Sequence, residues 1–176
     1  MKYTKVLSVQ SALAALAAAF AVLMLASQET RAATWKGLEP FVSKRADVER
    51  VLGKPTADRL ATDGTLRFDL PDGAVTVSFV TAKFIAARKL TPALEGTVLQ
   101  IVVQHAASTA TPESLKLVKH PDYEVVASGP TQVYTNPKDG IYLSFVGGRL
   151  KTTRYSYSAE QLETSKAPPP EAKPPQ

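Results

Sequence analysis

Two histidines are the residues of this chain best suited to acid–base or metal chemistry near neutral pH. His105 follows an apolar run that predicts a strand, and His120 lies beside Pro121 at the end of a predicted helix. Asp122 or Glu124 could complete a metal site, but no pair of ligands has the close spacing that places both on one helical face. We therefore expect structural or solvent-facing roles for both histidines. A small hydrolase or metal-dependent enzyme using His105 or His120 is the alternative.

Serine and aspartate side chains form no catalytic pattern. Ser78 and Ser144 lie inside predicted strands, without the glycine-flanked turn that presents a nucleophilic serine. Asp63, Asp69 and Asp72 each lie at or next to a turn signal, and no twelve-residue calcium loop with its terminal glutamate is present. We expect no catalytic residue, no metal and no cofactor.

A strip of tyrosines is the stronger binding feature. Gly147-Gly148 predicts a two-residue hairpin turn. A register counted from that turn places Val146 opposite Arg149, Ser144 opposite Lys151 and Tyr142 opposite Thr153. Tyrosine rings bury a large area at a small entropic cost, so a strip of them suits contact with a protein or sugar. The predicted binding face comprises Tyr142, Ser144, Lys151, Thr153, Tyr155 and Tyr157.

The alternative for this strip is that the tyrosines cover the second face of an ordinary sheet or contact the other half of the domain. In either case, the strip is predicted to lie opposite a core formed by Ile141, Leu143 and Phe145.

The strand that carries Tyr142 belongs to a repeated segment. LPDGAVTVSFV at 70–80 returns as NPKDGIYLSFV at 136–146, at an offset of 66 residues. Within each copy apolar and polar side chains alternate, as they do in a strand buried on one face. Val75, Val77 and Phe79 are therefore expected to face the core of the first copy.

A short helix is predicted before each copy. Ser43 is expected to cap the first helix, which ends at Gly53. Thr111 is expected to cap the second, with Leu115 and Val118 on its buried side. Residues 97–104 predict a strand that is apolar on both faces and therefore central, and 149–157 predict the last strand.

These elements predict an α+β fold. We expect a tandem pseudo-repeat of two αβββ units, about 35–104 and 105–162, with the short helices packed on one face of an antiparallel sheet. An isolated unit of this size would bury too little surface to be stable, so the two units are expected to form a single domain over 33–162.

The two ends of the chain predict export and a mobile tail. Lys2 and Lys5 precede an apolar run, and Thr30-Arg31-Ala32 has the small residues of a cleavage site, so 1–32 is predicted to be a signal peptide. An uncleaved membrane anchor is the alternative. The last residues, 163–176, contain five prolines and no large aliphatic side chain, and predict a disordered tail.

Composition excludes several functional classes. The 176 residues include no cysteine, which excludes a lipid-anchoring cysteine, disulfides and thiolate catalysis. The formal net charge of +5 falls to +3 when the leader departs with Lys2, Lys5, Arg31 and Glu29. Basic and acidic residues are interspersed, so nucleic-acid binding, which needs a concentrated basic face, is not expected.

The segment from Trp35 to Tyr157 resembles a group of uncharacterised exported bacterial proteins, mostly acidobacterial. The resemblance rests on Trp35, on Ser-x-Arg-x-Asp-Val-Glu at 43–49 and on Leu-Gly-x-Pro at 52–55, with further likeness at 96–103 and 139–141. More distantly, a helix ending in Leu-Gly-x-Pro before a hairpin is similar to SmpA/OmlA-type lipoproteins and to inhibitors built from tandem modules. That likeness implies a protein-contacting module without catalysis, although those lipoproteins carry a cysteine that this chain lacks.

The sequence therefore predicts an exported, periplasmic or extracellular module that binds a protein or envelope component through a sheet face. Besides the enzyme, a lipid- or glycan-binding protein is a second alternative to this prediction.

Overall fold

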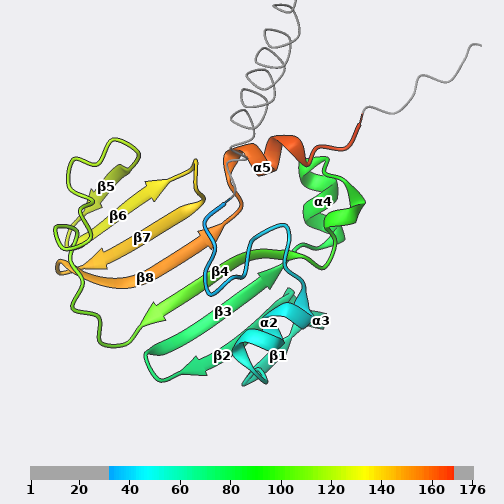
Figure 1. The fold of residues 1–176 in the computed structure, drawn as a ribbon, viewed down its shortest axis with the longest axis horizontal. Helices are drawn as coiled ribbons and strands as arrows, with labels where there is room; N and C mark the ends of the chain where they lie inside the picture. The colour runs from blue at the N-terminus through cyan, green and yellow to red at the C-terminus, as the bar shows by residue number, and fades with distance from the viewer. Residues whose placement is uncertain (1–31, 169–176) are drawn as a thin grey trace, which may run out of the picture. The chain divides into compact units, whose positions relative to one another are not determined.

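Eight antiparallel strands form one sheet in the computed structural model, which describes residues 32–168 (Figure 1). Together with a few short helices, this makes the chain an α+β protein, as predicted. The strands follow the order β1-β2-β3-β4-β8-β7-β6-β5 across the sheet. They comprise β1 (Ala57–Arg59), β2 (Thr65–Leu70), β3 (Gly73–Phe79), β4 (Val98–His105), β5 (Glu124–Ser128), β6 (Thr131–Asn136), β7 (Ile141–Val146) and β8 (Arg149–Ser156).

The middle of the sheet is formed by β4 and β8. These strands pair antiparallel, with Ile101 opposite Tyr155 and Val103 opposite Thr153. The central position predicted for 97–104 is confirmed, because β4 lies between β3 and β8. Gly147 and Gly148 both have positive φ, 57° and 72°, and make the predicted two-residue turn between β7 and β8.

The first predicted helix is present as α2 (Arg45–Leu52), and it ends at Gly53 as expected. Its predicted cap is wrong. The Ser43 hydroxyl accepts a hydrogen bond from the Glu39 backbone N–H at 2.9 Å instead of capping α2. The residue before the helix is Lys44, whose backbone N–H donates to the Asp47 carboxylate at 3.0 Å.

The second predicted helix is wrong. Residues 111–119 form turns, and only Thr111 begins a helical turn, with its carbonyl accepting from the Leu115 N–H at 3.1 Å. Lys116 then adopts a positive φ of 56°, which a continuing right-handed helix does not allow. Leu117 and Pro112 are buried in this segment, whereas Leu115 and Val118, predicted to be buried, are exposed.

Four other short helices occur within residues 32–168 without having been predicted. A Ser-x-x-Gln capping pattern marks the last of them, because Ser158 and Gln161 exchange hydrogen bonds at the helix start. They are α3 (Leu60–Asp63), α4 (Ala82–Arg88), the 3₁₀ helix η1 (Pro92–Leu94) and α5 (Ala159–Thr164).

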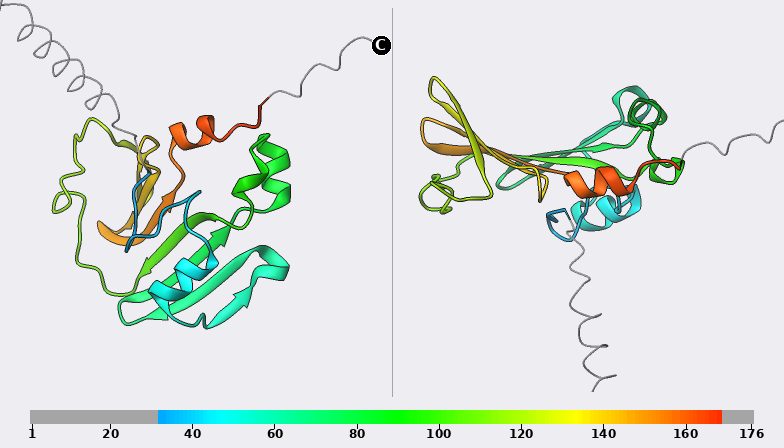
Figure 2. Two further views of the ribbon diagram at one scale, coloured as in Figure 1. Left: turned by 45° about the vertical axis from the view of Figure 1, so that its right-hand side comes forward. Right: turned by 90° about the horizontal axis from the view of Figure 1, so that it is seen from above.

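One face of the sheet carries the core, and we call it the packed face. It holds Leu66, Phe68, Val75, Val77, Ile101 and Val103 in the first half, and Tyr134, Leu143 and Phe145 in the second. Val48 of α2 packs on the first half and Leu117 on the second. Figure 2 shows α2 and the chain before it on this side of the sheet. Burial of these alternate side chains is what fixes the strand register.

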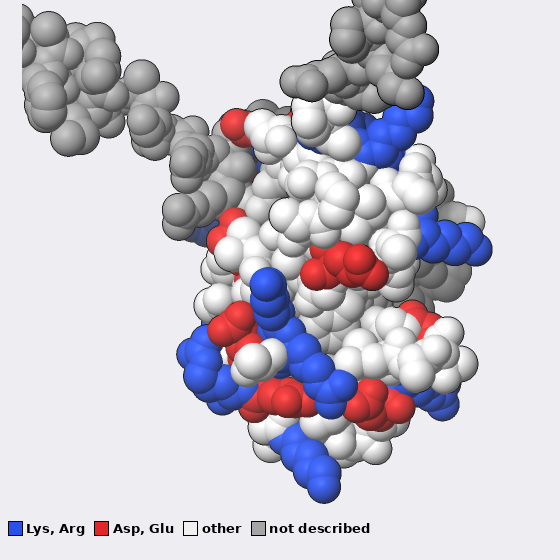
Figure 3. All heavy atoms as spheres, turned by 90° about the vertical axis from the view of Figure 1, so that its right-hand side faces the viewer, with Lys and Arg blue, Asp and Glu red and all other residues white. Residues whose placement is uncertain are grey.

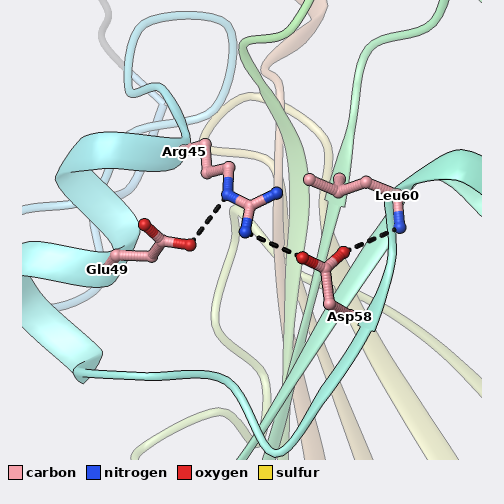
Figure 4. A network of polar contacts seen from close by, with 4 residues as sticks. All are labelled: Arg45, Glu49, Asp58 and Leu60. Atoms are coloured by element: carbon pink, nitrogen blue, oxygen red, sulfur yellow. Dashed lines mark hydrogen bonds and ion pairs between the residues drawn. The ribbon is translucent and has the colours of Figure 1, made fainter.

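A polar network joins α2 to the edge strand β1 (Figure 4). The Arg45 guanidinium donates to Glu49 at 2.7 Å and to Asp58 at 2.8 Å, and Asp58 also accepts from the Leu60 N–H at 3.1 Å. The hydrogen bond from Leu60 and the contact with Arg45 lower the pKa of Asp58. The surface shown in Figure 3 has basic and acidic side chains interspersed, which fits the absence of a basic run in the sequence.

The chain after α5 is held against the end of α4. The Thr91 N–H donates to the Ser165 carbonyl and the Ala167 N–H to the Lys89 carbonyl, both at 2.9 Å. The disorder expected from residue 163 therefore does not apply to 163–168. The remainder of that tail and the signal peptide predicted over 1–32, apart from Ala32, lie outside the described residues. No helix between residues 32 and 168 is long and apolar enough to span a membrane.

Candidate functional site

The face opposite the core is polar, and we call it the open face. Along each strand, its side chains alternate with those of the core. No helix of residues 32–168 lies across its centre (Figure 2). None of its side chains belongs to a hydrophobic cluster. From β3 to β6 the open face presents Ala74, Thr76, Ser78, Gln100, Val102, Gln104, Arg149, Thr152, Arg154, Ser156, Tyr142, Ser144, Val146, Thr131, Val133 and Thr135.

A β-bulge in β8 changes the register that was counted from the glycine turn. Val146 lies opposite Arg149 as predicted, but Ser144 lies opposite Thr152 and Tyr142 opposite Arg154. Lys151 is the extra residue, because Phe145 pairs with Leu150 and Ser144 with Thr152. The predicted pairs Ser144–Lys151 and Tyr142–Thr153 are therefore wrong, since one added residue reverses the faces of everything after it.

Of the six residues predicted to form the binding face, Tyr142 and Ser144 lie on the open face, and Lys151 lies exposed in the bulge. Thr153 and Tyr155 lie on the packed face, opposite Leu143 and Ile141.

The other three predicted residues, Thr153, Tyr155 and Tyr157, pack within the domain. Thr153 is 5% exposed, and Tyr155 packs against the first-half core. Burial, and to a smaller extent the neighbouring Tyr123, raises the pKa of the Tyr155 hydroxyl. Tyr157 stacks on Phe41 with ring centroids 4.7 Å apart. These tyrosines fit the alternative given for the strip, in which they cover an ordinary sheet and contact the rest of the domain.

Arg154 is the functional candidate that the sequence did not reveal. Its guanidinium carbon lies 3.7 Å from the centroid of the Tyr142 ring, in a cation–π contact between cross-strand neighbours. Its Nε is buried and has no hydrogen-bond partner. Only the bulge at Lys151 turns Arg154 to the open face, and a single-residue bulge leaves no clear pattern in sequence.

The groups on the open face are suited to hydrogen bonding. Hydroxyl and amide side chains dominate its centre, with one arginine and one aromatic ring beside each other. Such groups can donate and accept hydrogen bonds over a broad surface, and Tyr and Arg supply much of the binding energy at protein interfaces. No cluster of three metal-ligating side chains occurs in residues 32–168.

His105 lies at the edge of the packed face. Its Nε2 shares a hydrogen bond of 2.9 Å with the hydroxyl of buried Thr153. Two cavities, of about 630 and 230 Å³, share His105, Asp72 and Pro71 among their lining residues. Trp35 contributes to the smaller cavity. The structure thus brings His105 and a carboxylate to the same hollow, although the two are not an ion pair within 4.0 Å in the described chain.

We expect His105 to make stability depend on pH. Burial lowers the pKa of His105 below the ordinary value of about 6.5. His105 therefore takes up a proton more readily in the unfolded chain than in the folded one. The stability that neutral His105 contributes is present above about pH 6.5 and is lost as the pH falls. Denaturant unfolding at about pH 8 and about pH 5 should show a larger loss for the natural chain than for His105→Gln. Equal losses would contradict this assignment.

His120 has a different setting. Its Nδ1 accepts from the Asp122 backbone N–H at 3.2 Å and lies 3.9 Å from the Asp122 carboxylate, with both side chains more than a third exposed. The ring stands edge-on to Tyr123, with centroids 5.2 Å apart. Glu124, the other carboxylate weighed with the histidines, begins β5 and is exposed. This arrangement is a surface turn.

Comparison with known proteins gives one weak likeness. No protein-family model and no curated protein matches the chain. It is similar to the solved structure of a DUF4309 family protein (YjgB) from Bacillus subtilis subsp. subtilis str. 168. The two are 14% identical, the match covers 70% of this chain and 84% of that one, and the TM-score is 0.48. A likeness at this level establishes neither a shared fold nor a shared function.

Proposed function

We propose that this chain is an exported, non-enzymatic module that binds a partner protein of the cell envelope through the open face. The observation that carries the proposal is the asymmetry of the sheet. The two core clusters and α2 lie on one face, whereas α3 and α4 reach only one end of the other face, whose polar centre is uncovered (Figure 2). The leader predicted over 1–32 supports export.

The composition of the open face favours a polar partner surface. Ala74, Val102, Val133 and Val146 are its apolar members between β3 and β6, and Thr, Ser and Gln side chains lie among them. A lipid-binding face would instead need a broad apolar area. The Arg154–Tyr142 pair is the expected anchor, because both residue types are enriched where binding energy concentrates.

Site-specific photo-crosslinking tests this proposal. The chain has no cysteine, so a single introduced cysteine can carry a benzophenone at one chosen position. Thr76→Cys places the probe on the open face, beside the central strand β4, and Lys83→Cys places it on exposed α4 as a matched control. In the envelope fraction of native cells, the probe at position 76 should give a discrete protein adduct that the probe at position 83 does not. Adducts of equal yield from both, or none from position 76, would contradict the proposal.

We also propose that 35–104 and 105–162 derive from one duplicated unit. In support, β2 and β6 begin at Thr65 and Thr131, the offset of the sequence repeat, and each half runs through consecutive antiparallel strands whose last members, β4 and β8, pair with each other. The missing helix at 111–118 departs from a perfect duplication. Sequences of homologues should align their two halves at this offset beyond the strands; alignment limited to the hairpin would count against duplication.

A hydrolase remains the second candidate function, favoured by the cavity that His105 shares with Asp72. Hydrolysis of simple nitrophenyl esters by the full chain, abolished by His105→Ala with the fold retained, would support it. No activity above a denatured sample would remove that support.

A further inference from the structure

Exposed apolar side chains gather at one end of the sheet. Among residues 32–168, five of the six large hydrophobic residues with high exposure lie between positions 115 and 146. They are Leu115, Val118, Val125, Val126 and Val146, and the sixth is Val42. Val125 and Val126 are the two consecutive valines of the edge strand β5, 54% and 69% exposed. Exposed apolar side chains that are neighbours on a protein surface are typical of interaction sites.

The two edges of the sheet differ in how they are protected. β1 has three residues, two of them the charged Asp58 and Arg59, and leads directly into α3. Asp58 is also held by Arg45 of α2. Short length, charge and an adjoining helix are the usual means of preventing strand addition. β5 has five exposed residues, no bulge against β6, no lysine and no proline. Its outer edge pairs with no strand in the described chain.

We propose that two copies of this chain join edge to edge through β5, antiparallel, with Val126 on the two-fold axis. Every second residue of β5 turns its N–H and C=O away from β6, so a second β5 can complete these hydrogen bonds. The two eight-stranded sheets then become one continuous sheet. This inference goes beyond the proposed function and does not depend on it.

The sequence of β5 is self-complementary in this register. Val126 lies opposite its own copy, Val125 opposite Ala127, and Glu124 opposite Ser128. Glu124 is the only charged residue of the strand, and the register keeps it away from the other Glu124, so no like charges face each other. Paired valines on the axis are a favourable cross-strand contact. These features favour a second copy as the occupant of the edge.

The two-fold axis also places other exposed apolar side chains of both copies on one side of the joined sheet. A two-fold axis between antiparallel strands stands perpendicular to the sheet, so the packed faces of both copies lie on the same side. Val125 lies on that side, opposite Tyr134. The segment that holds Leu115 and Val118 covers the packed face of the same half through Leu117. The open faces of the two copies likewise adjoin on the other side, which doubles the width of the proposed binding surface.

Disulfide trapping tests the register. Opposed residues in an antiparallel pair have Cα atoms about 4.5 to 5.5 Å apart, within the range that a disulfide spans. Val126→Cys should therefore form a covalent dimer on mild oxidation. Ser128→Cys is the control, because two copies of residue 128 would lie about 14 Å apart along the seam. A mixture of Glu124→Cys and Ser128→Cys chains should crosslink only as the mixed pair.

Solution mass tests the interface without a crosslink. By light scattering coupled to size exclusion, the full natural chain should be a dimer and Val126→Lys a monomer, with circular dichroism confirming that the variant folds. Val42→Lys, another exposed valine, should remain a dimer. A monomeric natural chain, a dimer that survives Val126→Lys, or Ser128→Cys crosslinking alone as readily as Val126→Cys would overturn the proposal. These readouts measure the mass of the chain and need no envelope partner, so they can fail while photo-crosslinking from position 76 succeeds.

Discussion

Replacing Gly140 with alanine is expected to lower the free energy of unfolding by about 3 to 5 kcal/mol. Gly140 closes the turn between β6 and β7 with a φ of 69°, a conformation that costs an L-residue energy. A Cβ at this position would overlap the Ser156 carbonyl oxygen and lie 2.8 Å from the Tyr157 carbonyl oxygen. Backbone atoms at the end of β8 cannot move aside cheaply, so strain and overlap add. Equilibrium denaturation of the purified chain measures the effect.

Gly148→Ala is the matched control for this prediction. Gly148 has nearly the same φ, 72°, but a Cβ there would meet nothing within 4 Å. Its replacement should cost only the backbone strain, about 1 to 2 kcal/mol. If the two alanine variants lose the same stability, the close approach of the β6–β7 turn to the end of β8 is wrong.

Phe145→Ala and Tyr142→Ala are expected to differ widely although both lie on β7. Phe145 is fully buried on the packed face and meets Tyr134 edge-on at 5.6 Å, so its loss should cost about 3 to 5 kcal/mol. Tyr142 lies on the open face, and removing its ring loses mainly the contact with Arg154, about 1 kcal/mol or less.

The comparison is made by chemical denaturation of the two variants beside the natural chain. Equal destabilisation would mean that a second layer covers the open face. Each variant controls for the other, since both remove an aromatic ring from the same strand.

Much of the sheet could be predicted because alternation and turn chemistry act locally. Val75, Val77 and Phe79 face the core as the period-two pattern requires, and Gly147-Gly148 makes the predicted turn. The helix at 111–118 failed for a non-local reason. Leu117 packs onto Phe145 and its neighbours, and Lys116 adopts a left-handed conformation, so tertiary packing overrides the helix signals of Thr111 and Pro112.

About half of the candidate site could be predicted, because local alternation determines only the residues that precede the bulge. Tyr142 and Ser144 precede the glycine turn, and alternation alone assigns them to the face opposite the core. Thr153 and Tyr155 follow the bulge at Lys151, and their predicted face is reversed by one residue. Bulges depend on how a strand fits its neighbours, in this case β7 and β4 on either side of β8, and residue types do not encode that fit.

The most direct test of the account is the reaction of maleimide with two single-cysteine variants of the full chain, Thr152→Cys and Thr153→Cys. The substitutions are the same chemically and lie one residue apart, with Thr152 on the open face and Thr153 5% exposed on the packed face. We predict that Cys introduced at 152 reacts at a rate close to that of the unfolded chain, and that Cys introduced at 153 reacts much more slowly. Protection at 152 equal to that at 153, or the reverse order, would contradict an uncovered sheet face and with it the proposed function.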